Sequence, residues 1–317
     1  MSGKAPSNPS VKEALIDRDQ EGQRIDNFLR TNLKGVPKTH IYRILRTGQV
    51  RVNGGRIRPE YRLKAGDRVR IPPVRVAEAG QTPAPSPALL ERLRGRVIHE
   101  DSSLLILNKP AGLAVHGGSG LDFGAIEALR ALRTDEPFLE LAHRLDRDTS
   151  GCLIIAKKRS ALRGIQTLLR EGHGVDKRYL ALVVGRWPRR RSRVEAPLRK
   201  NTLRGGERVV RVEPSGKPSE TRFEVVETFS GATLVAARPI TGRTHQIRVH
   251  AVHVGHPIAG DDKYGDAAFN RSMADVGLRR LFLHAESLRF RLPGAEQEIQ
   301  VSAPLDDELE AVLGRLR

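Results

Sequence analysis

The chain has 317 residues, with 55 Lys or Arg against 37 Asp or Glu, and its formal net charge is +18. An excess of this sign favours polyanionic partners, nucleic acid before an acidic membrane surface. The single cysteine, Cys152, excludes a disulfide within the chain, and no apolar run approaches the roughly 20 residues that span a bilayer. We therefore expect a cytoplasmic protein that binds nucleic acid and has no membrane partner.

Two polar stretches divide the sequence. Residues 1–16 begin with MSGKAPSNPS, which lacks the apolar segment of a secretory signal, and we expect them to form a flexible tail. Residues 75–88 combine three prolines with no periodic apolar pattern, which is typical of a linker. The chain is thus predicted to hold a small module at 17–74 and a large one at 89–317.

The small module is predicted to contain two helices and a hairpin. Apolar residues recur at helical spacing over 25–33, and a second helix is expected to open at Thr39 and to end at Gly48. Alternating valines then precede Asn53-Gly54, a pair that favours a tight hairpin turn.

Basic side chains occupy most polar positions of this module, while aromatic side chains that could stack on bases are few. Phosphate contact is therefore expected, and it gives affinity more than sequence choice. A solvated charged face is the structural alternative. The positions that we select as RNA-binding are Lys38, Arg43, Arg46 and Arg51.

The small module resembles the S4-like (αL) RNA-binding domain. The resemblance lies in RIDNFLR, IYRILRTGQVRVNG and LKAGDRVRIP, and it covers most of residues 22–72. It implies two short helices and a small sheet that dock on structured RNA.

The large module mixes strands with helices. Strands are expected at 103–109, 152–158, 178–185, 219–229 and 232–240, and helices at 123–133, 159–171 and 244–255. This order indicates an α+β fold, with a mixed, largely antiparallel sheet flanked by helices, rather than a regular βαβ array. The basic stretch at 185–193 is expected to be a loop that contacts RNA or solvent.

Two motifs suggest cofactors or metals and are discounted. The Gly-rich segment at 116–124 lacks the Lys-Ser/Thr of a P-loop and the glycine spacing of a dinucleotide site. His245, His250, His253 and His256 lie close together, but they match no zinc-protease pattern and no cysteine flanks them. RNA contact or core packing is favoured for them, and no metal is predicted.

Charged residues are densest in HRLDRDTSG, at 143–151. Asp146 and Asp148 could form the carboxylate pair of a glycoside or phosphoester hydrolase. For Asp148, a turn or cap that binds local backbone amides is favoured. Arginines on both sides of Asp146 are expected to lower its carboxyl pKa, and an ionised carboxylate there could act as a nucleophile. On spacing alone, a surface ion-pair cluster fits equally well.

The same loop is similar to the signature of the RluA-type pseudouridine synthases. Further similar segments follow in that family's order, namely LNKPAGLAVH (107–116), KRYLALVVG (177–185), TGRTHQIRVH (241–250), GHPIAGDDKYG (255–265) and LFLHAESL (281–288). Together they span nearly all of residues 95–317.

The resemblance implies isomerisation of uridine to pseudouridine in large-subunit (23S) ribosomal RNA or its assembly intermediates. This reaction is redox-neutral and needs neither cofactor nor metal. A sister synthase that acts on another ribosomal or transfer RNA uridine is one alternative. A non-catalytic RNA-binding factor for ribosome assembly is the other. No apolar stripe argues for self-association, so a monomer is expected.

The resemblance also implies roles for individual residues. Asp146 corresponds to the catalytic aspartate, Tyr179 to the active-site tyrosine and Arg248 to the basic partner of the aspartate. Arg144 is implied to fill the place of a base that has left the RNA stack, with phosphate contact as its alternative. A core aromatic is the alternative for Tyr179. The remaining residues expected to bind substrate or to pack beneath it are His143, Arg147, Arg243, His245 and Leu283.

Overall fold

The computed structural model describes residues 11–18, 20–33, 36–74, 84–117, 123–172, 174–202 and 208–317. The chain divides into two compact units, Met1–Pro83 and Ala84–Arg317. Residues 1–10 of the predicted tail and 75–83 of the predicted linker lie outside the described residues. Within the described ranges, no helix is both long and apolar enough to cross a membrane.

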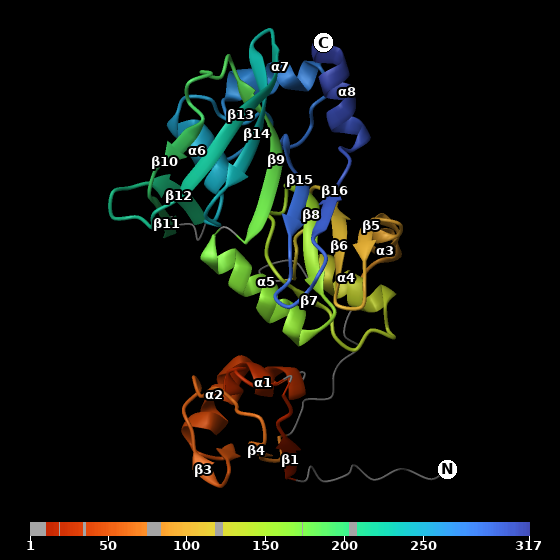
Figure 1. Ribbon diagram of the computed structural model, residues 1–317, viewed down its shortest axis with the longest axis vertical. Coiled ribbons are helices and arrows are strands. Elements are labelled where there is room, and N and C mark those ends of the chain that lie inside the picture. Colours follow the sequence, from red (N-terminus) through yellow and green to blue (C-terminus); the bar gives the residue numbers. More distant parts are fainter. Residues whose placement is uncertain are drawn as a thin grey trace. The chain divides into compact units, whose positions relative to one another are not determined.

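The first unit packs two helices against a small antiparallel sheet with the strand order β1-β4-β2-β3 (Figure 1). Buried aliphatic side chains around Phe28 hold the helices to the sheet. Its elements are β1 (Lys12–Leu15), α1 (Ile25–Asn32), α2 (Lys38–Arg46), β2 (Arg51–Val52), β3 (Gly55–Arg56) and β4 (Arg68–Ile71). The predicted S4-like architecture is confirmed.

The predicted hairpin turn joins β2 to β3. Asn53 and Gly54 have φ values of 50° and 79°, the positive angles that a two-residue turn of this kind requires. The second helix begins at Lys38, one residue before the predicted Thr39, and Pro37 occupies its N-cap position.

Two segments predicted to be irregular contain secondary structure. The predicted tail, 1–16, ends in β1, which pairs with β4 but leaves most of its side chains exposed. No apolar alternation therefore marked this strand in the sequence. The predicted linker, 75–88, ends in α3 (Pro87–Leu93), where the Ser86 side chain accepts a hydrogen bond from the amide of Leu89.

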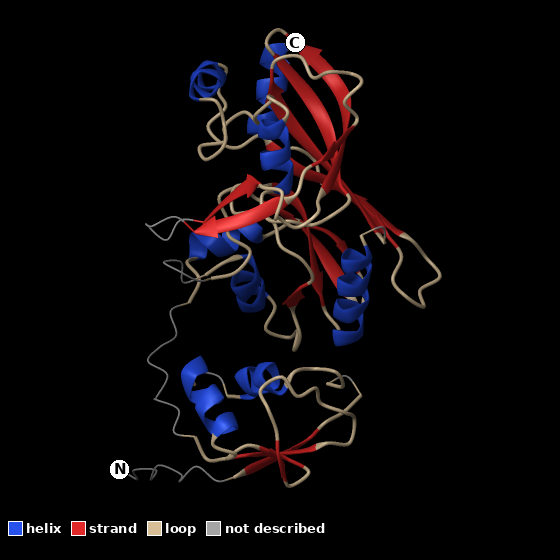
Figure 2. Ribbon diagram, turned by 90° about the vertical axis from the view of Figure 1, so that its left-hand side faces the viewer, coloured by secondary structure: helices blue, strands red, loops and turns tan. Residues whose placement is uncertain are grey.

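The second unit is built on a twisted ten-stranded sheet, and Figure 2 shows helices on both of its sides. Its main path runs β10-β13-β14-β9-β15-β8-β6-β5, with β16 paired to β15 and β7 to β8. Among the described strands, β15 and β8 form the one parallel pair. The predicted α+β class with a mixed, largely antiparallel sheet is confirmed.

The elements of this unit have the following bounds: β5 (Val97–Glu100), β6 (Leu104–Lys109), α4 (Ala125–Leu132), β7 (Glu140–Leu141), β8 (Ser150–Ala156), α5 (Arg159–Glu171), β9 (Val175–Val184), β10 (Arg193–Glu195), β11 (Leu198–Thr202), β12 (Arg208–Val212), β13 (Glu220–Phe229), β14 (Ala232–Pro239), α6 (Gln246–His253), α7 (Ala267–Asp275), β15 (Leu283–Phe290), β16 (Ile299–Ser302) and α8 (Asp307–Leu316). Strands β11 and β12 form a separate hairpin.

Strand β9 divides its side chains between the two faces of the sheet. Leu180 and Leu182 pack in the cluster that includes α7 and α8. Ala181 and Val183 pack on the opposite face, in the cluster that includes α6. Because side chains alternate along a strand, Tyr179 falls on the α6 face and packs against that second cluster.

Gly151 lies where β8 meets β15. Its φ is +103°, and a Cβ atom there would overlap the carbonyl oxygen of Ala285. We expect Gly151→Ala to lower the free energy of unfolding by about 3 kcal/mol, because overpacking adds to backbone strain. Urea denaturation measures this loss.

Gly231→Ala is the matched control, because Gly231 has a φ of +77° but open space around its Cβ position. The control should lose only about 1 kcal/mol, the cost of the backbone conformation. Equal losses in the two variants would contradict the crowding at Ala285.

Candidate active site

The loop between β7 and β8 is held at both of its ends. At its start, the amide of Ala142 donates to the carbonyl oxygen of Ile154 (3.0 Å), and His143 Nε2 accepts from the amide of Ile154 (3.0 Å). Near its end, Lys109 Nζ donates to the carbonyl oxygen of Arg147 (3.0 Å). The middle of the loop is thereby fixed against the sheet.

Lys109 is a fully buried cation beneath this loop. Its Nζ also donates to the carbonyl oxygens of Pro110 (3.0 Å) and Leu113 (2.9 Å). Burial lowers the pKa of Lys109 to about 7. Three carbonyl acceptors nevertheless match the three hydrogens of an ammonium group, so we assign the charged form. The lysine joins the turn after β6 to the loop before β8.

Asp146 lies in the middle of the loop, with its side chain 30% exposed. Its Oδ2 is 3.5 Å from Arg248 Nη1 and 3.8 Å from His245 Nε2. Burial raises the pKa of the Tyr179 phenol, and the charge of Asp146 raises it further. Of the three residues selected from the sequence as catalytic, the fold thus pairs Asp146 with Arg248 and places Tyr179 on the sheet face that α6 covers.

Helix α6 owes its position to the side chain of Gln246. The Oε1 atom of Gln246 accepts from Thr241 Oγ1 (2.7 Å) and from the amide of Arg243 (3.0 Å). Its Nε2 atom donates to the carbonyl oxygen of Glu220 on β13 (2.8 Å). These bonds fix the start of the helix, and Arg248 follows two residues later.

Arg248 makes its tightest contacts with a residue other than Asp146. Its Nε and Nη2 atoms each lie 2.7 Å from the carboxylate oxygens of Asp261, forming a bidentate pair. Burial alone would lower the pKa of Arg248, but the hydrogen bonds and charge of Asp261 keep it raised. The expected pairing of Arg248 with Asp146 is present at 3.5 Å, and the structure adds that the other nitrogens anchor the guanidinium on Asp261.

Asp261 and Tyr264 also belong to this cluster, although no pattern in the sequence singled them out. The amide of Tyr264 donates to Asp261 Oδ1 (3.0 Å), and the Arg248 guanidinium lies 4.9 Å from the centre of the Tyr264 ring. Both residues fall in the GHPIAGDDKYG segment, which was used only as a mark of resemblance. Its two adjacent aspartates gave no sign of which one is buried.

The basic residues predicted to contact substrate remain at the surface. Arg144, Arg147 and Arg243 are all exposed. Arg147 Nε lies 3.3 Å from the exposed carboxylate of Asp148, and Arg243 Nε donates to the carbonyl oxygen of Pro218 (3.2 Å). Exposed pairs of this kind hold a guanidinium weakly, so it can exchange its partner for a phosphate.

His143 and Leu283 lie below the surface. Leu283 is buried on β15 opposite Ala181 of β9, in the cluster that packs against Tyr179. His143 uses Nε2 as an acceptor for the amide of Ile154, so its ring is neutral and bonded to the backbone of β8.

The neutral state of His143 predicts a loss of stability in acid. Burial lowers its pKa from 6.5 to about 4, so between these values the unfolded chain binds a proton that the folded chain does not. Stability therefore falls as the pH drops through this window, by up to about 3 kcal/mol at pH 4.

Urea denaturation of wild type and His143→Gln at pH 7, 5.5 and 4 measures this contribution. Other buried histidines titrate in both proteins, so the difference between the two curves isolates His143. The wild type should lose more stability than the variant between pH 7 and 4. Parallel curves would contradict the assignment.

Comparison with known proteins supplies the family. The family profile described as RNA pseudouridylate synthase matches residues 103–253, and the S4 domain profile matches residues 23–69. Ribosomal large subunit pseudouridine synthase C of Escherichia coli O157:H7 is 60% identical over 313 residues, which cover 98% of each chain. The protein of that name from Pasteurella multocida is 58% identical over 98% of this chain and 95% of its own.

The chain belongs to the RNA pseudouridylate synthase family. Solved structures agree with this assignment. Human RNA pseudouridylate synthase domain containing 4 is 28% identical and superposes with a TM-score of 0.59 over 72% of this chain and 95% of its own. Human RNA pseudouridylate synthase domain containing 1 is also 28% identical, with a TM-score of 0.54 over 68% and 86%.

The clustered histidines of the synthase face different neighbours. His250 is buried, with Nδ1 2.9 Å from Thr221 Oγ1, whereas His256 Nδ1 lies 2.8 Å from the carbonyl oxygen of Val184. His253 is exposed at the end of α6. Within the part of the chain that the structure describes, no three His, Cys, Asp or Glu side chains are grouped to hold a metal ion.

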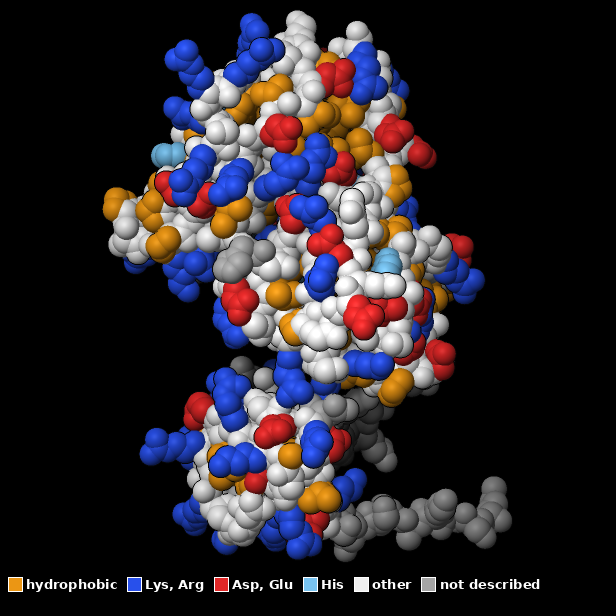
Figure 3. Space-filling model, in the orientation of Figure 1, with side chains coloured by type: hydrophobic (Ala, Val, Ile, Leu, Met, Phe, Trp, Pro, Cys, Tyr) orange, Lys and Arg blue, Asp and Glu red, His pale blue; other side chains and the backbone are white. Residues whose placement is uncertain are grey.

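In the S4 domain of the synthase, helix α2 separates apolar from basic side chains. Ile44 and its apolar neighbours are buried, while Arg43 and Arg46 are exposed on the other side, as is Arg51 on β2. The side chain of Lys38 lies outside the described ones. Figure 3 shows Lys and Arg side chains spread over the visible face of this unit, a distribution that suits phosphate contact.

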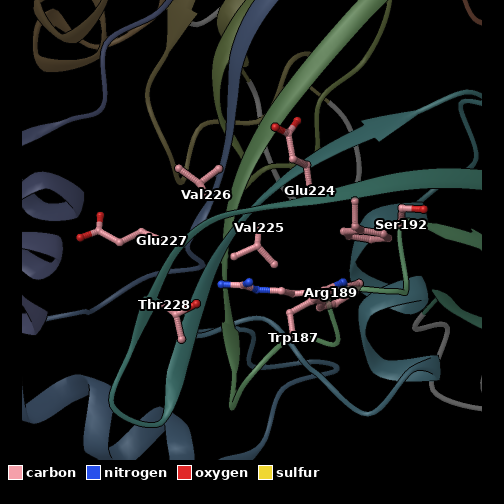
Figure 4. Close-up of a pocket in the computed structure, with 9 residues that line it drawn as sticks. Trp187, Arg189, Ser192, Glu224, Val225, Val226, Glu227 and Thr228 are labelled. Carbon is pink, nitrogen blue, oxygen red and sulfur yellow. The ribbon is translucent and has the colours of Figure 1, made fainter.

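A hollow of the synthase lies along the β13 edge of the sheet (Figure 4), and Asp146 is not among the residues that line it. Strand β10 pairs with β13 only over residues 220–222, so the rest of that edge is not covered by β10. A bulge between Val225 and Glu227 and the charges of Glu224 and Glu227 interrupt it. Such features keep an open edge from pairing with other strands.

Proposed function

We propose that the protein converts uridine to pseudouridine in large-subunit ribosomal RNA, with Asp146 as the catalytic carboxylate. Ribosomal large subunit pseudouridine synthase C of Escherichia coli O157:H7 is 60% identical over almost the whole chain. The observation that carries the role of Asp146 is its position in a partly open loop, 3.5 Å from the buried Arg248.

The reaction breaks the bond from ribose C1′ to uracil N1 and forms a bond from C1′ to C5; the C5 proton leaves and N1 takes up a proton, so the composition is unchanged. Asp146 acts on the sugar, either by attack at C1′ or by removal of a sugar proton. Arg248 can stabilise the carboxylate in both cases because it is anchored on Asp261 and adds a positive charge without closing over the oxygen.

Tyr179 and Arg144 act on the uracil side of the substrate. The ring of Tyr179 is half-buried on the α6 face of the sheet, where it can stack on uracil while its hydroxyl lies near the C5 proton. Because burial raises the pKa of this phenol, it stays protonated at neutral pH. Arg144 is exposed and can take the place of the flipped uridine in the RNA stack.

The two units divide the work. We assign RNA docking to the S4-like domain predicted at 17–74, to which β1 (Lys12–Leu15) adds a strand, and catalysis to the domain predicted at 89–317, which α3 (Pro87–Leu93) extends. The predicted tail, 1–16, and the predicted linker, 75–88, are shorter by these residues. His143, Arg147, Arg243, His245 and Leu283 form the rest of the proposed substrate region. We propose further that the enzyme acts as a cytoplasmic monomer, without cofactor or metal.

Carbodiimide-adduct primer extension tests the substrate. Ribosomal and transfer RNA would be mapped from a strain that lacks the gene, and from the same strain carrying wild type or Asp146→Asn. Stops in large-subunit RNA that vanish on deletion and return only with the wild-type gene are the expected result.

Other patterns would point to the alternatives. Lost stops in transfer RNA or in small-subunit RNA would indicate a sister synthase. Unchanged stops in every RNA would indicate a non-catalytic binding factor if the deletion strain also has a ribosome-assembly defect that the Asp146→Asn gene corrects.

A further inference from the structure

His245 has an unusual backbone conformation at the candidate site. Its φ is 53° and its ψ is 20°, in the left-handed region, at the residue that precedes α6. Among the described residues, the other non-glycine residue with positive φ is Asn53, whose hairpin turn requires it. Backbone strain away from such a turn commonly marks a functional position.

The ring of His245 bridges two groups. Its Nε2 atom lies 3.8 Å from Asp146 Oδ2, and its Nδ1 atom lies 2.7 Å from the hydroxyl of Tyr264. The same hydroxyl accepts a hydrogen bond from the amide of Val210 on β12 (2.9 Å). A chain of polar contacts thus runs from the β11–β12 hairpin to Asp146.

The chemistry of these partners fixes where the protons lie. The Tyr264 hydroxyl accepts from the amide of Val210 and can donate its own hydrogen to Nδ1, which leaves the ring proton on Nε2, the nitrogen that faces the carboxylate at 3.8 Å. Burial lowers the pKa of His245; Asp146 and Asp261 oppose this effect, whereas Arg248 and Lys263 add to it. The ring is therefore neutral, its Nδ1 is an acceptor, and the Tyr264 hydroxyl donates to it.

We propose that His245 and Tyr264 are positioning residues for Asp146. Tyr264 holds His245 as the tautomer with hydrogen on Nε2, and that N–H is directed at the carboxylate. This inference rests on the proposed catalytic role of Asp146. It goes beyond a substrate contact for His245, because the ring orients the reacting group and is itself oriented by a second residue.

Tyr264 contacts both of the side chains that face Asp146. Its hydroxyl binds His245, while its ring lies 4.9 Å from the guanidinium of Arg248. At 3.8 Å and 3.5 Å, neither His245 nor Arg248 closes a tight hydrogen bond to Asp146. Both groups face the same oxygen, Oδ2, so the carboxylate is oriented through that atom while its lone pairs stay available to the sugar.

Two substitutions of His245 separate this role from a backbone role. The amide nitrogen of glutamine can replace Nε2–H, whereas that of asparagine reaches only the Nδ1 position. Asparagine, however, tolerates the left-handed conformation better. We expect His245→Gln to keep the single-turnover rate within about tenfold of wild type and His245→Asn to lose about 100-fold, the scale of a misplaced reacting group. Thermal stability should follow the opposite order.

Tyr264→Phe and a spectrum complete the test. The variant keeps the ring beside Arg248 but removes the hydroxyl, so the rate should fall about tenfold with unchanged RNA affinity.

In full-length, nitrogen-labelled wild type, the two-bond nitrogen–proton NMR spectrum should show His245 as the pure Nε2–H tautomer. The His245→Asn spectrum assigns the signal, and Tyr264→Phe should mix the tautomers. Asp275→Asn, exposed at the end of α7, is the control and should match wild type.

Each outcome has a separate meaning. Equal or reversed rates for His245→Gln and His245→Asn, wild-type rates in both, or an Nδ1–H tautomer would overturn the positioning role. An inactive wild type on every RNA would instead count against the proposed function. In that case the wild-type spectrum would still show whether Tyr264 donates a hydrogen bond to His245. It would show this even if one of the two His245 variants fails to fold.

Discussion

An Asp146→Asn protein is expected to bind large-subunit RNA as tightly as wild type but to form pseudouridine at least about 10,000-fold more slowly. Asparagine has the shape of aspartate, yet its amide can neither attack C1′ nor remove a sugar proton. Release of tritium from C5-labelled RNA under single-turnover conditions gives the rate, and filter binding gives the affinity.

Asp148→Asn is the matched control for this prediction. Asp148 lies two residues away, carries the same charge, and is exposed beside Arg147. The control should keep its rate within a few-fold of wild type. A loss in Asp148→Asn as large as that in Asp146→Asn would favour the paired-carboxylate interpretation, and tritium release by Asp146→Asn at the wild-type rate would remove Asp146 from the chemistry.

Asp261→Asn is expected to cost about 3–5 kcal/mol of folding stability, because it leaves the buried guanidinium of Arg248 without its bidentate counterion. The side chains of Asp261 and Arg248 are only 1% and 9% exposed. Asparagine can still accept the amide of Tyr264, but its own N–H groups meet those of Arg248. The guanidinium should then shift onto Asp146, and the single-turnover rate of the folded fraction should fall about 100-fold.

Asp262→Asn is the control for this second prediction, since Asp262 is the exposed neighbour in the same segment. It removes the same charge and should change neither stability nor rate. Urea denaturation and tritium release measure the two quantities separately. Lower stability in Asp261→Asn with an unchanged rate of the folded enzyme would mean that Asp261 supports the fold but does not hold Arg248 for catalysis.

Much of the architecture could be predicted because the spacing of apolar residues within short segments indicated helices and strands. The helix predicted at 159–171 is α5, with the same bounds. The strand predicted at 178–185 lies largely within β9 (Val175–Val184), and its alternation places Tyr179 on the face that α6 covers. Short strands such as β1 and β7 escaped prediction, because pairing with distant partners, rather than their own periodicity, defines them.

The site was predicted less completely, because its contacts depend on tertiary geometry. Resemblance pointed to Asp146 and Arg248 and to their pairing, but it gave no sign that Asp261 anchors the guanidinium. Asp261 lies 13 residues beyond Arg248, after a turn whose course no local pattern describes. The left-handed conformation of His245 was equally hidden, because histidine gives no such signal in a sequence.

The parallel pairing of β15 with β8 has a consequence for synthesis of the chain. Strand β15 lies between β8, which follows the Asp146 loop, and β9, which carries Tyr179. Residues 283–290 must therefore leave the ribosome before the two halves of the sheet can be joined. A growing chain therefore carries Asp146 for more than a hundred residues before the strand that joins its half of the sheet to that of Tyr179 is available.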